Sequence, residues 1–394
     1  MGTTVDRRAF LKLSAASAGA AIGCRGRGSD GEEGAAAPPA MRYRRLGATG
    51  LEVSEVAFGA HQVENPTLMA AALEAGINTV CTSGGYRDGR EETAFGEAMA
   101  RIGVPRDKVV ILTGTDLRPN ETVESWLTAL EASLWRLRTD FLDIYYNAMV
   151  QTPDQVHSEV LFEAFERARQ AGKVRHLGVS GHHGGLQDCL EAALESGRYD
   201  VFFTKYDFVS YPDQDRILRR AAERGIGTMV FKTNAGNRQK EIKDLEAGGL
   251  SFKQATIRWA LSNPDVASVA VTMNTFDDID QAVAAVGSGL DAAEVAMLRR
   301  YAEEMYDKYC RFCTTCEASC PHGVAVADVM RYAMYFQYYG REKEAMQLYG
   351  ELPPAGTAAA CRGCAGDCDG ACPFGRQVRA GLVEAHRRLS WNRA

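Results

Sequence analysis

Eight of the eleven cysteines in this 394-residue chain lie in one short stretch of the sequence, between positions 310 and 372. Disulfides that stabilise a fold are spread along a chain, whereas thiolates gathered this closely are typical of metal ligation. The eight form two compact runs, C-x2-C-x2-C-x3-C-P and C-x2-C-x3-C-x3-C-P, made by Cys310, Cys313, Cys316, Cys320, Cys361, Cys364, Cys368 and Cys372. The pattern predicts a metal-binding segment in the last quarter of the sequence.

The first run has the spacing of bacterial ferredoxins, in which three thiolates bind one iron–sulfur cluster and the fourth, before proline, binds a second cluster. This crossed arrangement predicts two [4Fe–4S] clusters. One is held by Cys310, Cys313, Cys316 and Cys372, and the other by Cys361, Cys364, Cys368 and Cys320. The second run has one extra residue, which glycines at positions 363, 366 and 370 would let the backbone absorb. Two Zn(Cys)4 sites are the alternative, but these usually use separated C-x2-C pairs.

The segment between the two runs, residues 324–352, is rich in Met, Tyr and Ala at helical spacing. It predicts a small, mainly α-helical ferredoxin-like domain over residues 291–394. Five aromatic residues in this segment are expected to form a dry shell around the clusters, and they are Tyr332, Tyr335, Phe336, Tyr338 and Tyr339.

The rest of the chain alternates apolar runs with segments of helical spacing. Eight apolar runs are found, at residues 53–60, 77–82, 109–115, 141–147, 174–180, 201–206, 227–232 and 266–273. Between them lie predicted helices such as 122–137, with Thr122 as N-cap, and 159–171, ended by Gly172. Eight strand–helix pairs predict an α/β fold, a (β/α)8 TIM barrel, with chemistry at the carboxyl ends of the strands. A doubly wound sheet is the alternative, but no G-x-G-x-x-G turn follows an early strand.

Over residues 41–290 the chain resembles the aldo-keto reductases. The resemblance rests on residues 43–47 (YRRLG) and 50–54 (GLEVS), on 81–92 (CTSGGYRDGREE), and on 172–180 (GKVRHLGVS). It extends to a branch of that family with a C-terminal ferredoxin-like domain. The resemblance implies a barrel that transfers hydride between NADPH and a carbonyl, using a Tyr acid supported by Lys, His and Asp.

Only one of those four catalytic roles is matched here. Tyr86 stands at the tyrosine position, whereas Cys81, Gly114 and Asn147 stand at the aspartate, lysine and histidine positions. Without the lysine ammonium a phenol keeps a pKa of about 10, which suits acid–base work at neutral pH poorly. Cys81 is either a reactive thiol or a buried small apolar residue.

The cofactor side departs from the family as well. After the eighth apolar run, where the family places cations against the adenosine phosphate, residues 272–278 read TMNTFDD and carry two acids and no cation. A 2′-phosphate is disfavoured beside such charges, so NADP binding is doubtful. Ser180, at a position where the family contacts nicotinamide, and Lys232 remain the candidate cofactor-binding residues, and Lys232 or Lys205 could supply the missing positive charge.

The first 24 residues read as a twin-arginine export signal, with Arg7-Arg8 ahead of a weakly apolar Ala/Gly stretch. Residues 21–24 (AIGC) partly match a lipoprotein box, so Cys24 is either a lipid anchor or part of a discarded peptide. A flexible linker follows over residues 25–40. The expected location is the periplasm or cell envelope, with membrane attachment only through Cys24.

These patterns leave two main functional hypotheses and disfavour a third. The first is an exported iron–sulfur oxidoreductase that exchanges electrons between a small-molecule substrate at the barrel and a redox partner protein. The second is a non-catalytic barrel that carries the clusters in an envelope complex; conventional NADPH-dependent carbonyl reduction is disfavoured. A net charge of −6 without a Lys/Arg cluster in the body of the chain disfavours nucleic-acid binding.

Overall fold

Eight parallel strands form a closed barrel in the computed structural model, which describes residues 41–116, 121–182, 184–209, 214–236, 239–246 and 249–390. The strands are β3 (Val56–Gly59), β4 (Thr79–Cys81), β5 (Val110–Asp116), β6 (Leu142–Ala148), β7 (Val174–Gly181), β8 (Val201–Lys205), β9 (Gly227–Phe231) and β10 (Ser268–Thr272). Each pairs with the next in the chain, and β10 closes the barrel against β3 with Val269 opposite Val56. The predicted (β/α)8 barrel is confirmed, and each of the eight apolar runs overlaps one of these strands, to within one residue at its carboxyl end for β5, β6 and β7.

The barrel strands are buried on both faces because alternate residues point to opposite sides. Leu112 and Ile144 belong to a small apolar cluster shared by neighbouring strands, whereas the adjacent Ile111 and Tyr145 belong to the large cluster under the helices. A two-stranded hairpin, β1 (Tyr43–Arg45) and β2 (Glu52–Ser54), precedes the barrel and inserts the fully buried Leu46.

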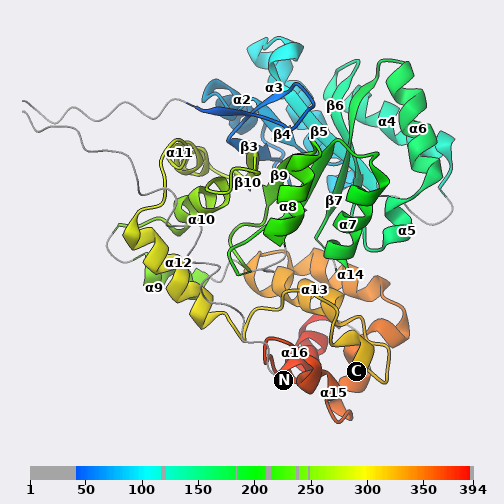
Figure 1. Ribbon diagram of the computed structural model, residues 1–394, viewed down its shortest axis with the longest axis vertical. Helices are drawn as coiled ribbons and strands as arrows, with labels where there is room; N and C mark the ends of the chain where they lie inside the picture. The colour runs from blue at the N-terminus through cyan, green and yellow to red at the C-terminus, as the bar shows by residue number, and fades with distance from the viewer. Residues whose placement is uncertain are drawn as a thin grey trace, which may run out of the picture.

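Helices surround the barrel (Figure 1). They are α2 (Pro66–Glu74), α3 (Arg90–Ile102), α4 (Val123–Leu137), α5 (Pro153–Val156), α6 (Glu159–Gln170), α7 (Leu186–Ser196), α8 (Gln214–Glu223), α9 (Gln239–Leu245), α10 (Phe252–Leu261), α11 (Phe276–Ala284) and α12 (Ala292–Glu304). Thr122 caps α4 as predicted, since its side chain accepts a hydrogen bond from the Ser125 amide. Helix α6 ends at Ala171, one residue before Gly172, which takes the left-handed conformation with φ of 73°.

The cysteine-bearing part of the chain is helical. It contains α13 (Val326–Tyr338), α14 (Glu342–Glu351), α15 (Asp367–Ala371) and α16 (Val378–Leu389), with short 3₁₀ turns between them and no strand among the described residues after β10. The single predicted helical segment 324–352 is thus two helices, because the chain turns at Gly340, where φ is 62°. Helix α13 packs against both α14 and α16. The likeness of this domain to ferredoxins stays a prediction.

This C-terminal domain docks against the barrel with α13 and α14 beside the ends of the strands (Figure 1). The Lys232 side chain, just after β9, bonds to Tyr335 of α13, and His61, just after β3, contacts Arg341 at the start of α14. One apolar cluster continues from Phe208 and Tyr301 on the barrel side to Met330 and Leu382 in the C-terminal domain. The two parts therefore share a core, and the C-terminal domain covers the carboxyl ends of the barrel strands.

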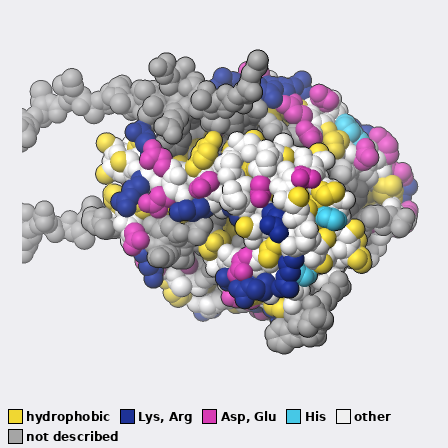
Figure 2. Space-filling model, turned by 90° about the horizontal axis from the view of Figure 1, so that it is seen from below, with side chains coloured by type: hydrophobic (Ala, Val, Ile, Leu, Met, Phe, Trp, Pro, Cys, Tyr) yellow, Lys and Arg dark blue, Asp and Glu magenta, His cyan; other side chains and the backbone are white. Residues whose placement is uncertain are grey.

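The face on the side of the C-terminal domain carries Lys, Arg, Asp and Glu side chains interspersed with scattered apolar ones (Figure 2). Within the described ranges, none of the helices has both the length and the apolar character needed to cross a bilayer. The predicted export signal, Cys24 and the linker lie outside the described residues.

Candidate functional site

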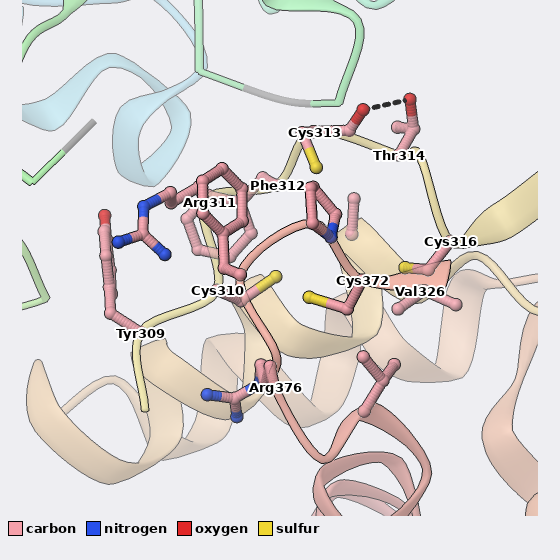
Figure 3. A pocket seen from close by; sticks show the side chains of 14 residues that line it. Tyr309, Cys310, Arg311, Phe312, Cys313, Thr314, Cys316, Val326, Cys372 and Arg376 are labelled. Atoms are coloured by element: carbon pink, nitrogen blue, oxygen red, sulfur yellow. Dashed lines mark hydrogen bonds between the residues drawn. The ribbon is translucent and has the colours of Figure 1, made fainter. Parts of the chain in front are cut away.

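Four cysteines from the two runs line one hollow in the C-terminal domain. Cys310, Cys313 and Cys316 come from the loop between α12 and a short 3₁₀ turn at Glu317–Ser319, and Cys372 comes from the residue after α15. Their sulfur atoms face a common space (Figure 3). This is the crossed set that the ferredoxin spacing predicts, with one cysteine supplied by the other run.

The loop that carries these cysteines has an uncommon backbone. Phe312 and Thr314, on either side of Cys313, have positive φ angles of 59° and 60°. Each such residue costs about 1–3 kcal/mol and persists only where the surrounding structure requires it. Alternation between right- and left-handed residues turns successive amides into a concavity that suits an anionic group, as at many iron–sulfur sites. The Thr315 hydroxyl also donates a hydrogen bond to the Cys313 sulfur, at 3.3 Å.

Arg376 brings a positive charge to the same hollow. It lies beside Cys310 in Figure 3, its Nη1 donates to the Lys308 carbonyl, and its buried Nε has no hydrogen-bond partner. A buried donor without an acceptor is costly, and a thiolate-bound anionic cluster would offer it sulfur acceptors. Burial raises the pKa of Cys310 to about 11, although Arg376 opposes this shift. Because metal coordination deprotonates thiols outright, the donor set fits a cluster better than four free thiols.

The remaining four cysteines form the second predicted set. Cys361, on a 3₁₀ turn, is close enough to Cys320, Cys364 and Cys368 for their charges to interact, so burial first and then these neighbours raise its pKa to about 11. Gly366, in the stretch where the second run is one residue longer, has φ of 93°. The glycine thus adopts a conformation that other residues avoid, as the predicted accommodation of the insertion requires.

No group of three or more His, Cys, Asp or Glu side chains within the described ranges is placed so that it could hold a metal ion. A cubane makes a different demand on its ligands. Each of its four thiolates binds a different iron atom, so the sulfurs surround a space instead of closing on one point. The hollow in Figure 3 has that form.

The prediction that five aromatic residues form a shell around the clusters is wrong for Tyr335. The hollow is lined by Tyr309, Phe312 and Phe374, and none of the five aromatic residues of 324–352 contributes to its lining. Tyr335 instead points to the barrel, where its hydroxyl accepts a hydrogen bond from Lys232 at 2.8 Å. Helical spacing identified a buried face of α13 but not the partner that this face meets.

The candidate acid Tyr86 stands at the barrel mouth, at the start of a 3₁₀ turn after β4. Its ring packs edge-on against His61, with ring centroids 4.6 Å apart, and His61 Nε2 lies 2.9 Å from Arg341 of the C-terminal domain. Burial, reinforced by the nearby cations Arg341, Lys232 and Arg87, lowers the pKa of His61 well below its usual value. His61 and Arg341 were missed from the sequence because nothing in their spacing links them.

The three altered catalytic positions are either buried or have no room for a side chain. A Cβ on Gly114 would lie 2.2 Å from the Tyr146 carbonyl oxygen and 2.7 Å from its ring, so no side chain fits where the family has lysine. Asn147 is 1% exposed and donates to the Gln155 carbonyl. Cys81 is 4% exposed, and burial raises its pKa, so it is an inert buried thiol.

The two candidate cofactor-binding residues, Ser180 and Lys232, lie in different surroundings. Ser180 is buried at the end of β7, whereas Lys232 keeps some exposed surface and pairs with Tyr335. Lys205 is held by Asp207 at 3.0 Å, so it is committed to the buried interface. Near the expected adenosine site, Thr275 caps α11, and the Asp278 carboxylate accepts from the Thr275 amide and pairs with Lys253, which leaves Asp277 as an exposed acid. His182 is partly buried with its ring 5.7 Å from Phe231, and His183 lies outside the described residues.

The closed parallel barrel and the tyrosine at its mouth define an aldo-keto reductase scaffold. The chain belongs to the aldo/keto reductase family, whose model matches residues 57–303. That match includes α12 and ends before the first cysteine run.

Three proteins with this scaffold illustrate the likeness. The chain is 23% identical to the aldo-keto reductase AFTS1 of Alternaria alternata, over 67% of this chain and 91% of that protein. It is 25% identical to a versiconal hemiacetal acetate reductase of Aspergillus parasiticus, over 68% and 97%. Among solved structures, the aldo-keto reductase AKR11C1 from Bacillus halodurans in its holo form superposes with a TM-score of 0.54 and 22% identity, covering 66% of this chain and 96% of that one. At 22% identity, this structural likeness shows a shared fold alone.

Substitution of Gly114 tests whether the lysine position is closed. We expect Gly114→Ala to lower the free energy of unfolding by about 1–3 kcal/mol, because its Cβ would overlap backbone and ring atoms of Tyr146. Urea denaturation followed by circular dichroism measures this. Gly289→Ala is the matched control, since no atom lies within 4 Å of its added Cβ. Equal stability of the two variants would contradict the overlap.

Proposed function

We propose that this protein is an iron–sulfur oxidoreductase in which two [4Fe–4S] clusters are the working redox centres. The observation that supports it most strongly is the convergence of Cys372 with Cys310, Cys313 and Cys316 on one hollow. The ferredoxin spacing requires one cluster to take three cysteines from one run and a fourth from the other. A zinc site built from the cysteines of one run would not need Cys372 beside Cys310, Cys313 and Cys316. When bound, the clusters supply one-electron transfer; the chain's cysteines hold them, and its buried cations and apolar side chains enclose them.

The state of the barrel supports giving the clusters the main redox role. Its lysine position has no room for a side chain, and its aspartate position is an inert buried cysteine. Because a Tyr acid of this family depends on those two neighbours, Tyr86 alone is poorly equipped for hydride-coupled proton transfer. The barrel's relatives are named as reductases or dehydrogenases, among them an L-galactose dehydrogenase of Arabidopsis thaliana. We extend only the oxidoreductase class to this chain.

The position of the first cysteine set supports electron exchange with the barrel mouth. Thr314 lies against Gly184 in the loop after β7, where an added Cβ would come within 2.3 Å of it. Phe312 packs on Tyr309, and the Tyr309 hydroxyl donates to Asp207 after β8. The second set, near α15, would then face a redox partner protein.

Export is part of the same proposal. Twin-arginine transport carries folded proteins, so clusters inserted in the cytoplasm would reach the periplasm or envelope intact. The motif at residues 6–12 (DRRAFLK) supports this route, and a lipid at Cys24 would tether the protein to the membrane.

The second candidate is a barrel without catalysis that carries the clusters inside an envelope complex. The loss of three catalytic positions favours it. A conventional NADPH-dependent carbonyl reductase is disfavoured by the acids at residues 277 and 278.

Metal content and cysteine substitution test the clusters. We expect a brown protein with about eight iron atoms per chain, four in each cubane. Cys372→Ser and Cys320→Ser should each lower the iron content to about half, because each removes a ligand of a different cluster. Cys189→Ser, at a cysteine fully buried in α7, should leave it unchanged. A colourless protein containing zinc would disprove the cluster proposal.

Titration with NADPH tests the cofactor side. Isothermal calorimetry on the iron-loaded protein should show no saturable binding at millimolar NADPH, because the exposed Asp277 lies in the segment where the family places cations against the adenosine phosphate. NADH, which lacks this phosphate, is the comparison ligand. Tight NADPH binding would restore the conventional reductase as the better interpretation.

Export is tested by fractionating cells that express the full chain. We expect the protein in the periplasmic or membrane fraction, and Arg7→Lys with Arg8→Lys should retain it in the cytoplasm. Cys24→Ala separates a lipid anchor from a soluble periplasmic form. Unchanged distribution of the double lysine variant would rule out the twin-arginine route.

A further inference from the structure

Helix α13 of the C-terminal domain places a tyrosine at the barrel mouth, beside a lysine of the barrel. The Lys232 ammonium follows β9 and donates a hydrogen bond of 2.8 Å to the Tyr335 hydroxyl. The two residues are 103 positions apart and come from different domains. Tyr335 is 3% exposed, whereas Lys232 keeps part of its surface open.

Two further cations surround the Tyr335 ring. The Arg341 guanidinium carbon lies 4.2 Å from the ring centroid and that of Arg331 lies 5.7 Å from it. Arg331 is 1% exposed, and its Nε has no hydrogen-bond partner. Their acidic partners, Asp328 and Glu344, keep partial exposure. The charges closest to the phenol are therefore positive.

These charges favour the ionised phenol. Burial by itself would raise the pKa of Tyr335, but Lys232 first, then Arg331 and Arg341, lower it to about 7. On the same helix, burial raises the pKa of Tyr332 to about 12, although Arg331 stacks on its ring as well. A neighbouring tyrosine, Tyr339, has its pKa raised by burial. Among these three tyrosines of one helix region, only Tyr335 has its pKa lowered.

The backbone at Lys232 is also uncommon. Lys232 has φ of 58° and Ala235 has φ of 45°, although neither is glycine. Left-handed conformations at such residues are strained, and they cluster at functional sites. The turn after β9 thus holds Lys232 in a defined position toward Tyr335.

Tyr335 is connected to the inherited tyrosine by a series of contacts. Arg341 packs on the Tyr335 ring, lies 2.9 Å from His61 Nε2, and His61 packs on Tyr86. His61, Tyr86 and Lys232 are each partly exposed, while the strand ends around them are buried. Lys232 is thus the member of the pair that keeps exposed surface.

We propose that Tyr335 and Lys232 form a proton-donating pair at the domain interface, which protonates the oxygen of a small carbonyl substrate in place of the family's lost lysine-supported tyrosine. As two electrons, which the proposed clusters would supply one at a time, reduce the carbonyl, the proton passes from Tyr335 Oη to the substrate oxygen. A second proton, from water, forms the new C–H bond, so that the C=O group becomes CH–OH. The O–H bond of the phenol breaks, and the phenolate that remains is stabilised by Lys232, Arg331 and Arg341. Water then returns the proton. The inference rests on the proposed function only for the source of the electrons.

The pair is tested by ultraviolet titration of the cluster-loaded protein. Difference spectra of wild type minus Tyr335→Phe, which cancel the cluster absorbance, should show one tyrosinate forming at about pH 7. Lys232→Met should raise this midpoint by roughly 1–3 pH units, because it removes an opposite charge in direct contact. Tyr332→Phe, the matched control on the same helix, should leave the midpoint in place. A wild type that titrates like Tyr335→Phe would overturn the inference.

The substrate class is tested with dihydroxyacetone as the probe. A carbonyl oxygen that accepts a hydrogen bond from Tyr335 stabilises the protonated phenol and should raise its titration midpoint. Glycerol, which has the same carbon skeleton without the carbonyl, should not. If excess dihydroxyacetone leaves the midpoint unmoved, the pair does not bind a small carbonyl.

Iron analysis of the same samples separates the two proposals. Tyr335→Phe should keep the iron content and the electron paramagnetic resonance spectrum of the wild type, since no cysteine is changed. A protein without clusters that still titrates at about pH 7 would refute the proposed function and leave the proton site standing. Full clusters with no such titration would refute the proton site and leave the proposed function standing.

Discussion

The docking of the C-terminal domain over the carboxyl ends of the barrel strands determines the rest of this structure. It is stabilised by an apolar cluster that runs without interruption from Phe208, Phe252 and Tyr301 to the helices of the cysteine domain. Burying apolar surface is the main favourable term in such an association, and it is not directional. Direction comes from polar contacts at the edge of the cluster, notably Lys232 with Tyr335 and Arg311 with the Val209 carbonyl.

The barrel keeps its fold although three catalytic positions of the family have changed. The core of a (β/α)8 barrel depends on alternating apolar residues of the strands, not on the polar residues at their ends. Gly114 and Cys81 fill the mouth with small or apolar groups, and Tyr146 occupies the space beside Gly114. The site that we propose lies instead at the interface, where charges from both domains meet.

The two candidate chemistries of the molecule are complementary. In our proposals the cysteines hold electron carriers, and the cations near Tyr335 favour the ionised form of its phenol. An arrangement in which electrons and a proton arrive from the same domain explains why α13 carries tyrosines on its buried face. It also explains why the first cysteine set abuts the loops after β7 and β8 and not the outer helices.

The sequence alone determined the eight strands and the caps of α4 and α6, because these depend on local periodicity and on short-range capping. Its division of the cysteines into two crossed sets stays a prediction, and the structure brings the four cysteines of the first set around one hollow. The sequence also identified which family positions had changed. It did not reveal why a side chain at Gly114 is impossible, since that depends on the neighbouring strand. Nor did it predict Tyr335, which helical spacing assigned to a cluster shell. Residues 103 positions apart become partners only through the packing of one domain on another, and spacing in the chain carries no information about that distance.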